Sequence, residues 1–72
     1  MFSLKQLTVF DAIARLGSVS EAAEQLSMTQ PAASMSLQQL EQVLGAELFV
    51  RTKNRVVLSD KGKLLQPMTR SL

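Results

Sequence analysis

The fold of this chain is decided by residues 17–45, which read GSVSEAAEQLSMTQPAASMSLQQLEQVLG. In the second half of this segment, four apolar residues fall within a narrow stripe at about 100° per residue: Ala33, Leu37, Leu40 and Leu44. The opposite side carries Pro31, Met35, Gln38 and Gln42, with Ser34 on its flank. Thr29 is the expected N-cap, and Gly45 stands where the helix ends. The segment therefore predicts one helix, about residues 30–44, with a buried leucine side and an exposed, uncharged side.

A shorter helix precedes this one. Ser18 and Glu21 have the spacing of a capping box, in which the hydroxyl serves a first-turn N–H and the carboxylate reaches back to the cap residue. The apolar residues that follow lie on one side, where small side chains allow another helix to approach closely: Val19, Ala22, Ala23 and Leu26. The helix lasts about two turns, and residues 27–29 separate it from the next. A short helix, a tight turn and a longer helix form a helix-turn-helix motif.

The N-terminal segment predicts a third helix, over residues 4–16, that ends at Gly17. Its apolar residues recur at three- and four-residue intervals and predict a broad buried face: Leu4, Leu7, Phe10, Ile13, Ala14 and Leu16. Beyond the helix-turn-helix, Leu48 and Phe49 supply two more large groups to the core.

The C-terminal third of the chain has a different sequence pattern. Residues 50–58 predict two short β segments joined by a turn at residues 53–54. Ser59 and Asp60 are suited to begin a fourth helix. We expect Pro67 to bend this helix, because proline removes one backbone hydrogen bond.

Composition narrows the possible functions. A chain of 72 residues forms one domain at most, and 46% hydrophobic with 19% charged residues is typical of a folded globule. The chain has no cysteine and no histidine, which removes the common metal sites and the Cys- or His-based catalytic groups, so we expect neither an enzyme nor a cofactor. It also has no apolar run of membrane-spanning length and no signal-peptide pattern, so we expect a cytoplasmic location and no membrane partner.

Charge is distributed unevenly along the chain. Residues 1–49 hold two Lys or Arg against five Asp or Glu, a formal net charge of −3. Residues 50–72 hold six against one, a net charge of +5. A segment this basic suggests contact with a polyanion, although charge alone is equally compatible with a solvated face.

One string of residues runs in register through nearly the whole chain: Leu7, Phe10, Gly17-Ser18, Ala22-Ala23, Leu26, Gln30-Pro31-Ala32, Ser34, Leu40-Glu41, Leu44-Gly45, Leu48-Phe49, Arg51, Leu58-Ser59 and Gly62. This string resembles the N-terminal signature of LysR-type bacterial transcription regulators. The resemblance implies a mostly α winged helix-turn-helix fold, with a three-helix core, a two-stranded β wing and the start of a C-terminal linker helix. It divides the chain into a DNA-binding domain, residues 1–58, and the start of a linker or dimerisation helix, residues 59–72.

The resemblance also implies partners. Family members bind imperfect palindromic promoter sites, usually as tetramers built from dimers, and act as repressors or activators. They carry a C-terminal domain of two α/β lobes that senses a small molecule, which this chain lacks. We therefore expect a piece of a longer protein that binds double-stranded DNA at a promoter or operator, forms a homodimer or tetramer at full length, and meets its effector only through the missing domain.

In the family, the recognition helix, here about residues 30–44, lies in the major groove, and the wing, here about residues 50–58, meets the backbone or minor groove. The chemistry of the exposed side agrees with this, because Gln30 and Gln38 can bracket adenine and Ser34 can donate or accept. Pro31 and Met35 offer apolar contact to thymine methyl groups. The expected DNA-binding residues are Ser18, Thr29, Gln30, Pro31, Ser34, Met35, Gln38, Arg51, Lys53 and Arg55.

Some of these assignments have alternatives. Thr29 could serve as a cap alone, Gln38 could be plain solvated surface, and Arg51 could brace the fold instead of contacting DNA. Two positions depart from the family pattern: Met35 and Asn54 stand where family members often carry arginine.

Dimerisation is expected through the partial apolar stripe of the fourth helix: Leu64, Leu65, Met68 and Leu72. For Leu64 and Leu65, packing within the chain is an equal alternative. Two other functions compete with the operator-binding hypothesis: a winged-helix module that binds a partner protein, and a DNA-binding or chromosome-associated protein of another winged-helix family.

Overall fold

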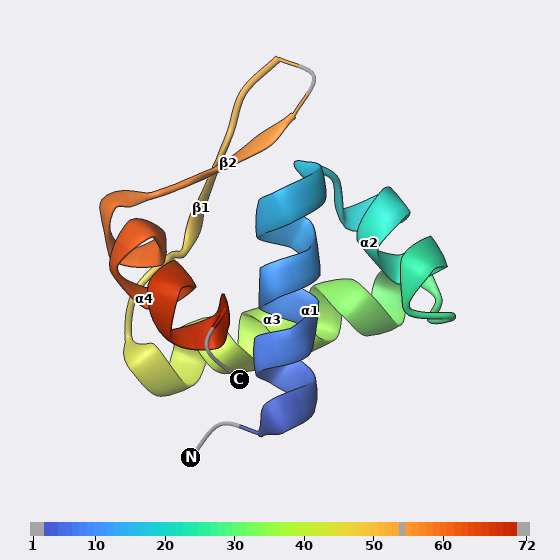
Figure 1. The fold of residues 1–72 in the computed structure, drawn as a ribbon, viewed down its shortest axis with the longest axis horizontal. Helices are drawn as coiled ribbons and strands as arrows, with labels where there is room; N and C mark the ends of the chain where they lie inside the picture. The colour runs from blue at the N-terminus through green and yellow to red at the C-terminus, as the bar shows by residue number, and fades with distance from the viewer. Residues whose placement is uncertain (1–2, 54, 71–72) are drawn as a thin grey trace.

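The computed structural model describes residues 3–53 and 55–70. Within them, four helices and one two-stranded antiparallel sheet follow one another along the chain (Figure 1). Their bounds are α1 Leu4–Leu16, α2 Val19–Gln25, α3 Gln30–Leu44, β1 Phe49–Arg51, β2 Val56–Leu58 and α4 Asp60–Arg70. Figure 1 shows the β-hairpin projecting away from the helices. The predicted mostly α winged helix-turn-helix fold is confirmed, including the predicted bounds of α1 and α3. Every helix in the described part of the chain is too short or too polar to span a membrane.

Both ends of α1 are closed by flanking residues. The Ser3 hydroxyl accepts from the Gln6 N–H at 3.2 Å, and Gln6 Oε1 accepts from the Ser3 N–H at 3.0 Å. This is a reciprocal capping box, which the sequence prediction missed. At the other end Gly17 has φ 68° and donates to the Ile13 carbonyl at 2.8 Å, so the predicted glycine cap is confirmed.

The capping box predicted at the start of α2 is only half formed. The Ser18 hydroxyl accepts from the Glu21 N–H at 3.2 Å, as predicted. Among the described residues, the Glu21 carboxylate makes no return hydrogen bond to the Ser18 N–H. Glu21 is exposed, so water can satisfy its carboxylate instead.

Helices α1, α2 and α3 meet through small side chains. Four alanines at this junction are at most 2% exposed: Ala12, Ala22, Ala23 and Ala33. They form one apolar cluster with Val9, Ile13 and Val19. Because a methyl group occupies little space and has no rotamers to order, the helices can approach closely at little entropic cost.

A second cluster joins the C-terminal half to α1. Phe10, Leu40 and Leu48 are at most 1% exposed, and Leu65 of α4 packs against them. The ring centroid of Phe49 lies 5.3 Å from that of Phe10, with 44° between the planes, a favourable tilted arrangement. The predicted contribution of the Leu-Phe pair to the core is confirmed.

Two leucines assigned to buried faces are exposed. Leu4 is 66% exposed, because nine positions at about 100° each place it on the opposite side of α1 from the buried Ile13. Leu44 is on the buried side of α3 but lies in its last turn, and it remains 39% exposed. Conversely, Val9 and Ser36 are buried although the apolar pattern did not include them.

The hairpin and α4 are fastened by short contacts. β1 and β2 pair Phe49 with Leu58, Val50 with Val57 and Arg51 with Val56. Ser59 caps α4 as predicted: its hydroxyl accepts from the Gly62 N–H at 3.1 Å and donates to the Glu47 carbonyl at 2.7 Å. A Cβ at position 62 would lie 2.2 Å from the Leu48 carbonyl oxygen, so only glycine fits there.

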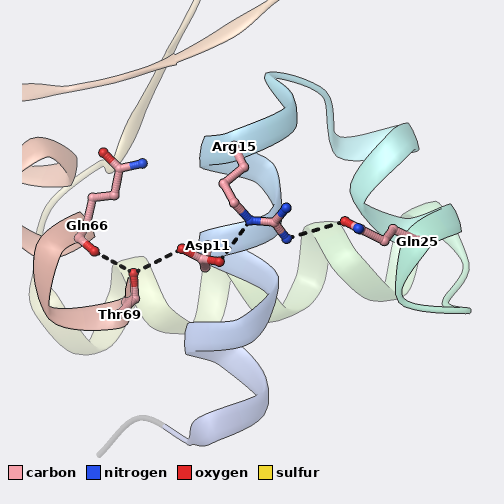
Figure 2. A network of polar contacts seen from close by, with 5 residues as sticks. All are labelled: Asp11, Arg15, Gln25, Gln66 and Thr69. Carbon is pink, nitrogen blue, oxygen red and sulfur yellow. Dashed lines mark hydrogen bonds and ion pairs between the residues drawn. The ribbon is translucent and has the colours of Figure 1, made fainter. Parts of the chain in front are cut away.

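Helix α4 continues through Pro67 to Arg70. A chain of polar contacts ties its last turn to α1 and α2 (Figure 2). The buried Thr69 hydroxyl lies 3.5 Å from Asp11 Oδ1. The other oxygen of Asp11 accepts from Arg15 Nε at 3.1 Å, and Arg15 Nη2 donates to Gln25 Oε1 at 3.4 Å. Asp11 and Arg15 of α1 together thus link α4 with α2.

Candidate nucleic-acid interface

The exposed side of α3 carries the uncharged residues predicted for it. Pro31, Met35 and Gln38 are exposed, Met35 to 60%, and Ser34 is half-buried beside them. Leu40, on the other side, is completely buried. The predicted division of this helix into a buried and an outward side is confirmed.

The first residues of α3 are contacted by its N-cap and by a residue of α2. Thr29 is the N-cap, and its hydroxyl accepts from the Ala32 N–H at 3.2 Å, which confirms its predicted capping role. Gln30 is the first helical residue, and its Oε1 accepts from the Ser20 hydroxyl of α2 at 3.0 Å. Ser20 was not among the predicted site residues, because only the packing of α2 on α3 brings it to Gln30.

A cleft of about 260 Å³ lies between the hairpin and the starts of α2 and α3. It brings together five of the predicted site residues: Ser18, Gln30, Arg51, Lys53 and Arg55. Polar groups that are far apart in the sequence therefore face one space.

A second cleft, of about 410 Å³, runs between α3 and the hairpin. It is lined in part by Ser34 and Gln38 of α3 and by Arg51 of β1. Arg51 lines both clefts, so this cation of the hairpin borders both the exposed side of α3 and the starts of α2 and α3. Thr29, Pro31 and Met35 line neither cleft.

The three cations of the hairpin have different environments. Arg51 and Lys53 are exposed, and within residues 3–53 and 55–70 the Arg51 guanidinium has no hydrogen bond or ion pair. Arg55 is also exposed, but its Nη2 donates to the Leu16 carbonyl at 3.0 Å. Bracing of the fold, which the sequence left open for Arg51, is therefore observed at Arg55. Asn54 lies outside the described residues.

The apolar residues predicted for dimerisation differ in how far they are exposed. Leu64 is 71% exposed and Met68 is 67% exposed. Leu65 is half-buried and packs against the cluster of Phe10, Leu40 and Leu48. This agrees with the alternative prediction, that Leu65 packs within the chain. Leu72 lies outside the described residues.

Comparison with known families identifies the chain. Residues 4–63 match the family model described as bacterial regulatory helix-turn-helix protein, lysR family. The chain belongs to the LysR family. A RuBisCO operon transcriptional regulator of Allochromatium vinosum is 49% identical over 61 residues, which are 85% of this chain and 20% of that protein. This LysR-family chain thus spans about a fifth of the length of the curated relatives it matches.

Solved structures of the family share its fold. DarR from Vibrio fischeri, in complex with DNA, is 35% identical and superposes with a TM-score of 0.92 over 99% of this chain and 24% of DarR. The CbnR DBD, also in complex with DNA, is 30% identical with a TM-score of 0.91. That match covers 97% of this LysR-family chain and 80% of the CbnR fragment.

Proposed function

We propose that this LysR-family chain binds specific sequences of double-stranded DNA in the regulation of transcription. In this proposal α3 enters the major groove, and the hairpin meets the backbone or minor groove. The observation that carries it is the position of Arg51, which lines both clefts and so connects the uncharged outer side of α3 with the cations of the hairpin. Relatives solved with DNA support the same function.

The outer side of α3 has the side chains that base recognition requires. Gln30 and Gln38 each offer a donor and an acceptor, and the Ser34 hydroxyl can serve as either. Pro31 and Met35 present apolar surface that suits thymine methyl groups. These residues would supply sequence preference, because base edges differ in the pattern of donors, acceptors and methyl groups that they show in the major groove.

The hairpin and the helix starts would supply affinity. Arg51, Lys53 and Arg55 are cations that can meet phosphates, whose contacts position a protein on DNA without reading its sequence. Ser18 and Thr29 cap the starts of α2 and α3, and backbone N–H groups there favour an anion. Each neutralised phosphate should steepen the salt dependence of binding, with a slope of about 0.9 per contact.

We further propose that α4 pairs two copies of the protein, with residues 1–58 as the DNA-binding domain and residues 59–72 as the start of the pairing helix. Leu64 and Met68 leave large apolar surface exposed, and a cavity of about 300 Å³ between them and Leu44 continues it toward α3. Covering this surface with a second copy would bring two α3 helices to one DNA site. An effector would act on the full-length protein through a further domain.

Binding to a pool of random duplexes, followed by sequencing of the retained molecules, tests the proposed function. The wild-type chain should enrich one motif, with two-fold symmetry if two copies bind together. Lys53→Ala should weaken retention of all sequences alike, whereas Lys5→Ala should leave it unchanged, because Lys5 lies on α1 and lines neither cleft. Retention without any enriched motif would show that the chain does not recognise sequence.

A further inference from the structure

The side chain of Gln30, the first residue of α3, accepts a hydrogen bond from a residue of α2. Gln30 has a fixed backbone, because the Thr29 cap closes the first turn and the Thr29 carbonyl accepts from the Ala33 N–H at 3.1 Å. Pro31 restricts the chain further at the next position. The amide of Gln30 is then held by the Ser20 hydroxyl, which donates to Oε1 at 3.0 Å.

Both partners face the space where DNA would lie. Ser20 and Gln30 line the cleft of about 260 Å³ together with Arg51 and Lys53. Both are exposed, so neither side chain is required by the core. The hydrogen bond between Ser20 and Gln30 is therefore not needed for core packing, and it can orient the exposed Gln30 amide.

We propose that Ser20 is a positioning residue that turns the Gln30 amide so that its NH₂ group, and not its carbonyl oxygen, faces the bases. This inference rests on the proposed function. The oxygen and nitrogen of an amide diverge from the same carbon atom, so directing Oε1 toward Ser20 points Nε2 in another direction. Ser20 would thus convert a side chain that can both donate and accept into one that mainly donates.

The bases that such a group prefers follow from their edges. Bidentate recognition of adenine requires the glutamine oxygen to accept from N6 while the nitrogen donates to N7. Oε1 keeps a second lone pair, but with Oε1 directed toward α2 the oxygen and nitrogen would not face the edge of adenine together, so this arrangement is disfavoured. A group that only donates suits guanine, which shows the two acceptors O6 and N7, or thymine, which shows the acceptor O4 and no donor. Adenine shows its N7 acceptor beside the N6 donor, and a group that only donates leaves this N6 donor without a partner. We therefore expect Gln30 to select guanine or thymine and to discriminate against adenine.

The test is the random-duplex selection, repeated with Ser20→Ala, Ser20→Thr, Gln30→Ala and the double variant. The wild-type motif should contain one column, abolished by Gln30→Ala, that favours guanine or thymine. Ser20→Ala should raise the frequency of adenine relative to these bases in that column by about fivefold or more. Ser20→Thr, which keeps the hydroxyl, should retain the wild-type preference. Circular dichroism and thermal unfolding should show that all four variants stay folded.

The double variant separates positioning from direct contact. If Ser20 acts through Gln30, adding Ser20→Ala to Gln30→Ala should change nothing further. If Ser20→Ala leaves the wild-type motif unaltered, the inference about Ser20 is wrong while the proposed function stands. The same holds if Ser20→Ala has an equal effect in the wild type and in Gln30→Ala. Failure of the wild-type chain to enrich any motif would instead overturn the proposed function and the inference together.

Discussion

Arg55 of the hairpin donates a hydrogen bond from Nη2 to the carbonyl oxygen of Leu16, the last residue of α1, at 3.0 Å. Next to it, the Val56 N–H donates to the Gly17 carbonyl at 3.1 Å. Unpaired carbonyls at a helix C-terminus attract a cation, so the hairpin is fastened where α1 ends and α2 is about to begin. A Cβ at Gly17 would lie 2.8 Å from the Arg55 guanidinium, so glycine also leaves room for this contact.

Substitutions of Lys53 and Arg55 should therefore separate in their effects on stability. Both Lys53→Ala and Arg55→Ala should weaken binding to all DNA sequences and flatten its salt dependence, by about 0.9 in slope for each lost phosphate contact. Only Arg55→Ala should also lower the free energy of unfolding, by about 1 kcal/mol, because it removes the bond to Leu16. Urea denaturation and binding titrations at several salt concentrations measure the two effects. Unchanged affinity of both variants at low salt would show that the hairpin does not contact DNA.

Two glycine-to-alanine substitutions should lower the free energy of unfolding by different amounts. Gly62→Ala should strongly destabilise the docking of α4, because its Cβ would lie 2.2 Å from the Leu48 carbonyl oxygen and the backbone would have to move. Gly45→Ala has open space, but φ is 66°, so it should cost about 1 kcal/mol through backbone strain alone. Thermal unfolding of both variants gives the comparison. Equal destabilisation would mean that the contact with Leu48 is not tight.

Leucine truncation should distinguish the core from the exposed apolar surface. Leu40→Ala should lower the free energy of unfolding by about 2 to 5 kcal/mol, because Leu40 is completely buried in one cluster with Phe10 and Leu48. Leu64→Ala, at a residue that is 71% exposed, should change it by less than about 0.5 kcal/mol. Chemical denaturation measures both. A large loss in Leu64→Ala would place that side chain in an intrachain core.

The proposed pairing of α4 makes a separate prediction. Leu64→Lys should lower self-association without changing the stability of the monomer, because it places charge on surface that a second copy would cover. Sedimentation equilibrium across a range of concentrations gives the association constant. Lys63→Ala serves as a control, because Lys63 is an exposed residue of α4 that does not line the cavity beside Leu64. Association that is the same in wild type and Leu64→Lys would exclude this surface from the interface.

Ser34 tests the recognition helix directly. Ser34→Phe should abolish sequence preference while the chain stays folded, because Ser34 lies off the buried side and borders the cleft next to the hairpin. Gln42→Phe is the matched control, two turns further along the same outer side, and should keep the enriched motif. Random-duplex selection and circular dichroism read the two properties separately. If Ser34→Phe unfolds the chain, the assignment of this side chain to the outer surface is wrong.

Local signals in the sequence were sufficient to predict the helices and the residues at which they begin and end. Gly17 and Gly45 end α1 and α3 in the left-handed conformation, and Thr29 caps α3, as their positions predicted. Each of these effects involves atoms within a few residues of one another, so residue type and spacing are enough to reveal it. The exposed Leu4 shows where such reasoning fails, because a periodic pattern does not say how far round a helix its neighbours extend.

Contacts between distant side chains could not be predicted. Glu41 accepts from the Leu48 N–H at 2.8 Å, and Ser20 donates to Gln30, but both pairings depend on angles between elements that periodicity does not specify. The same applies to Arg55, whose charge suggested only an anionic partner. The candidate site was therefore predictable as a set of exposed residues on α3 and the hairpin, whereas the internal partners that orient them required the structure.

The alanines at the helix junction have a consequence for how such a protein can diversify. Ala12, Ala22, Ala23 and Ala33 fix the crossing of three helices with side chains that have no alternative rotamers. Pro31, Met35 and Gln38 on the outer side of α3 are exposed, so replacing them should leave this junction intact. During evolution, a chain built in this way can acquire a new DNA target through outer-surface changes while its scaffold stays the same.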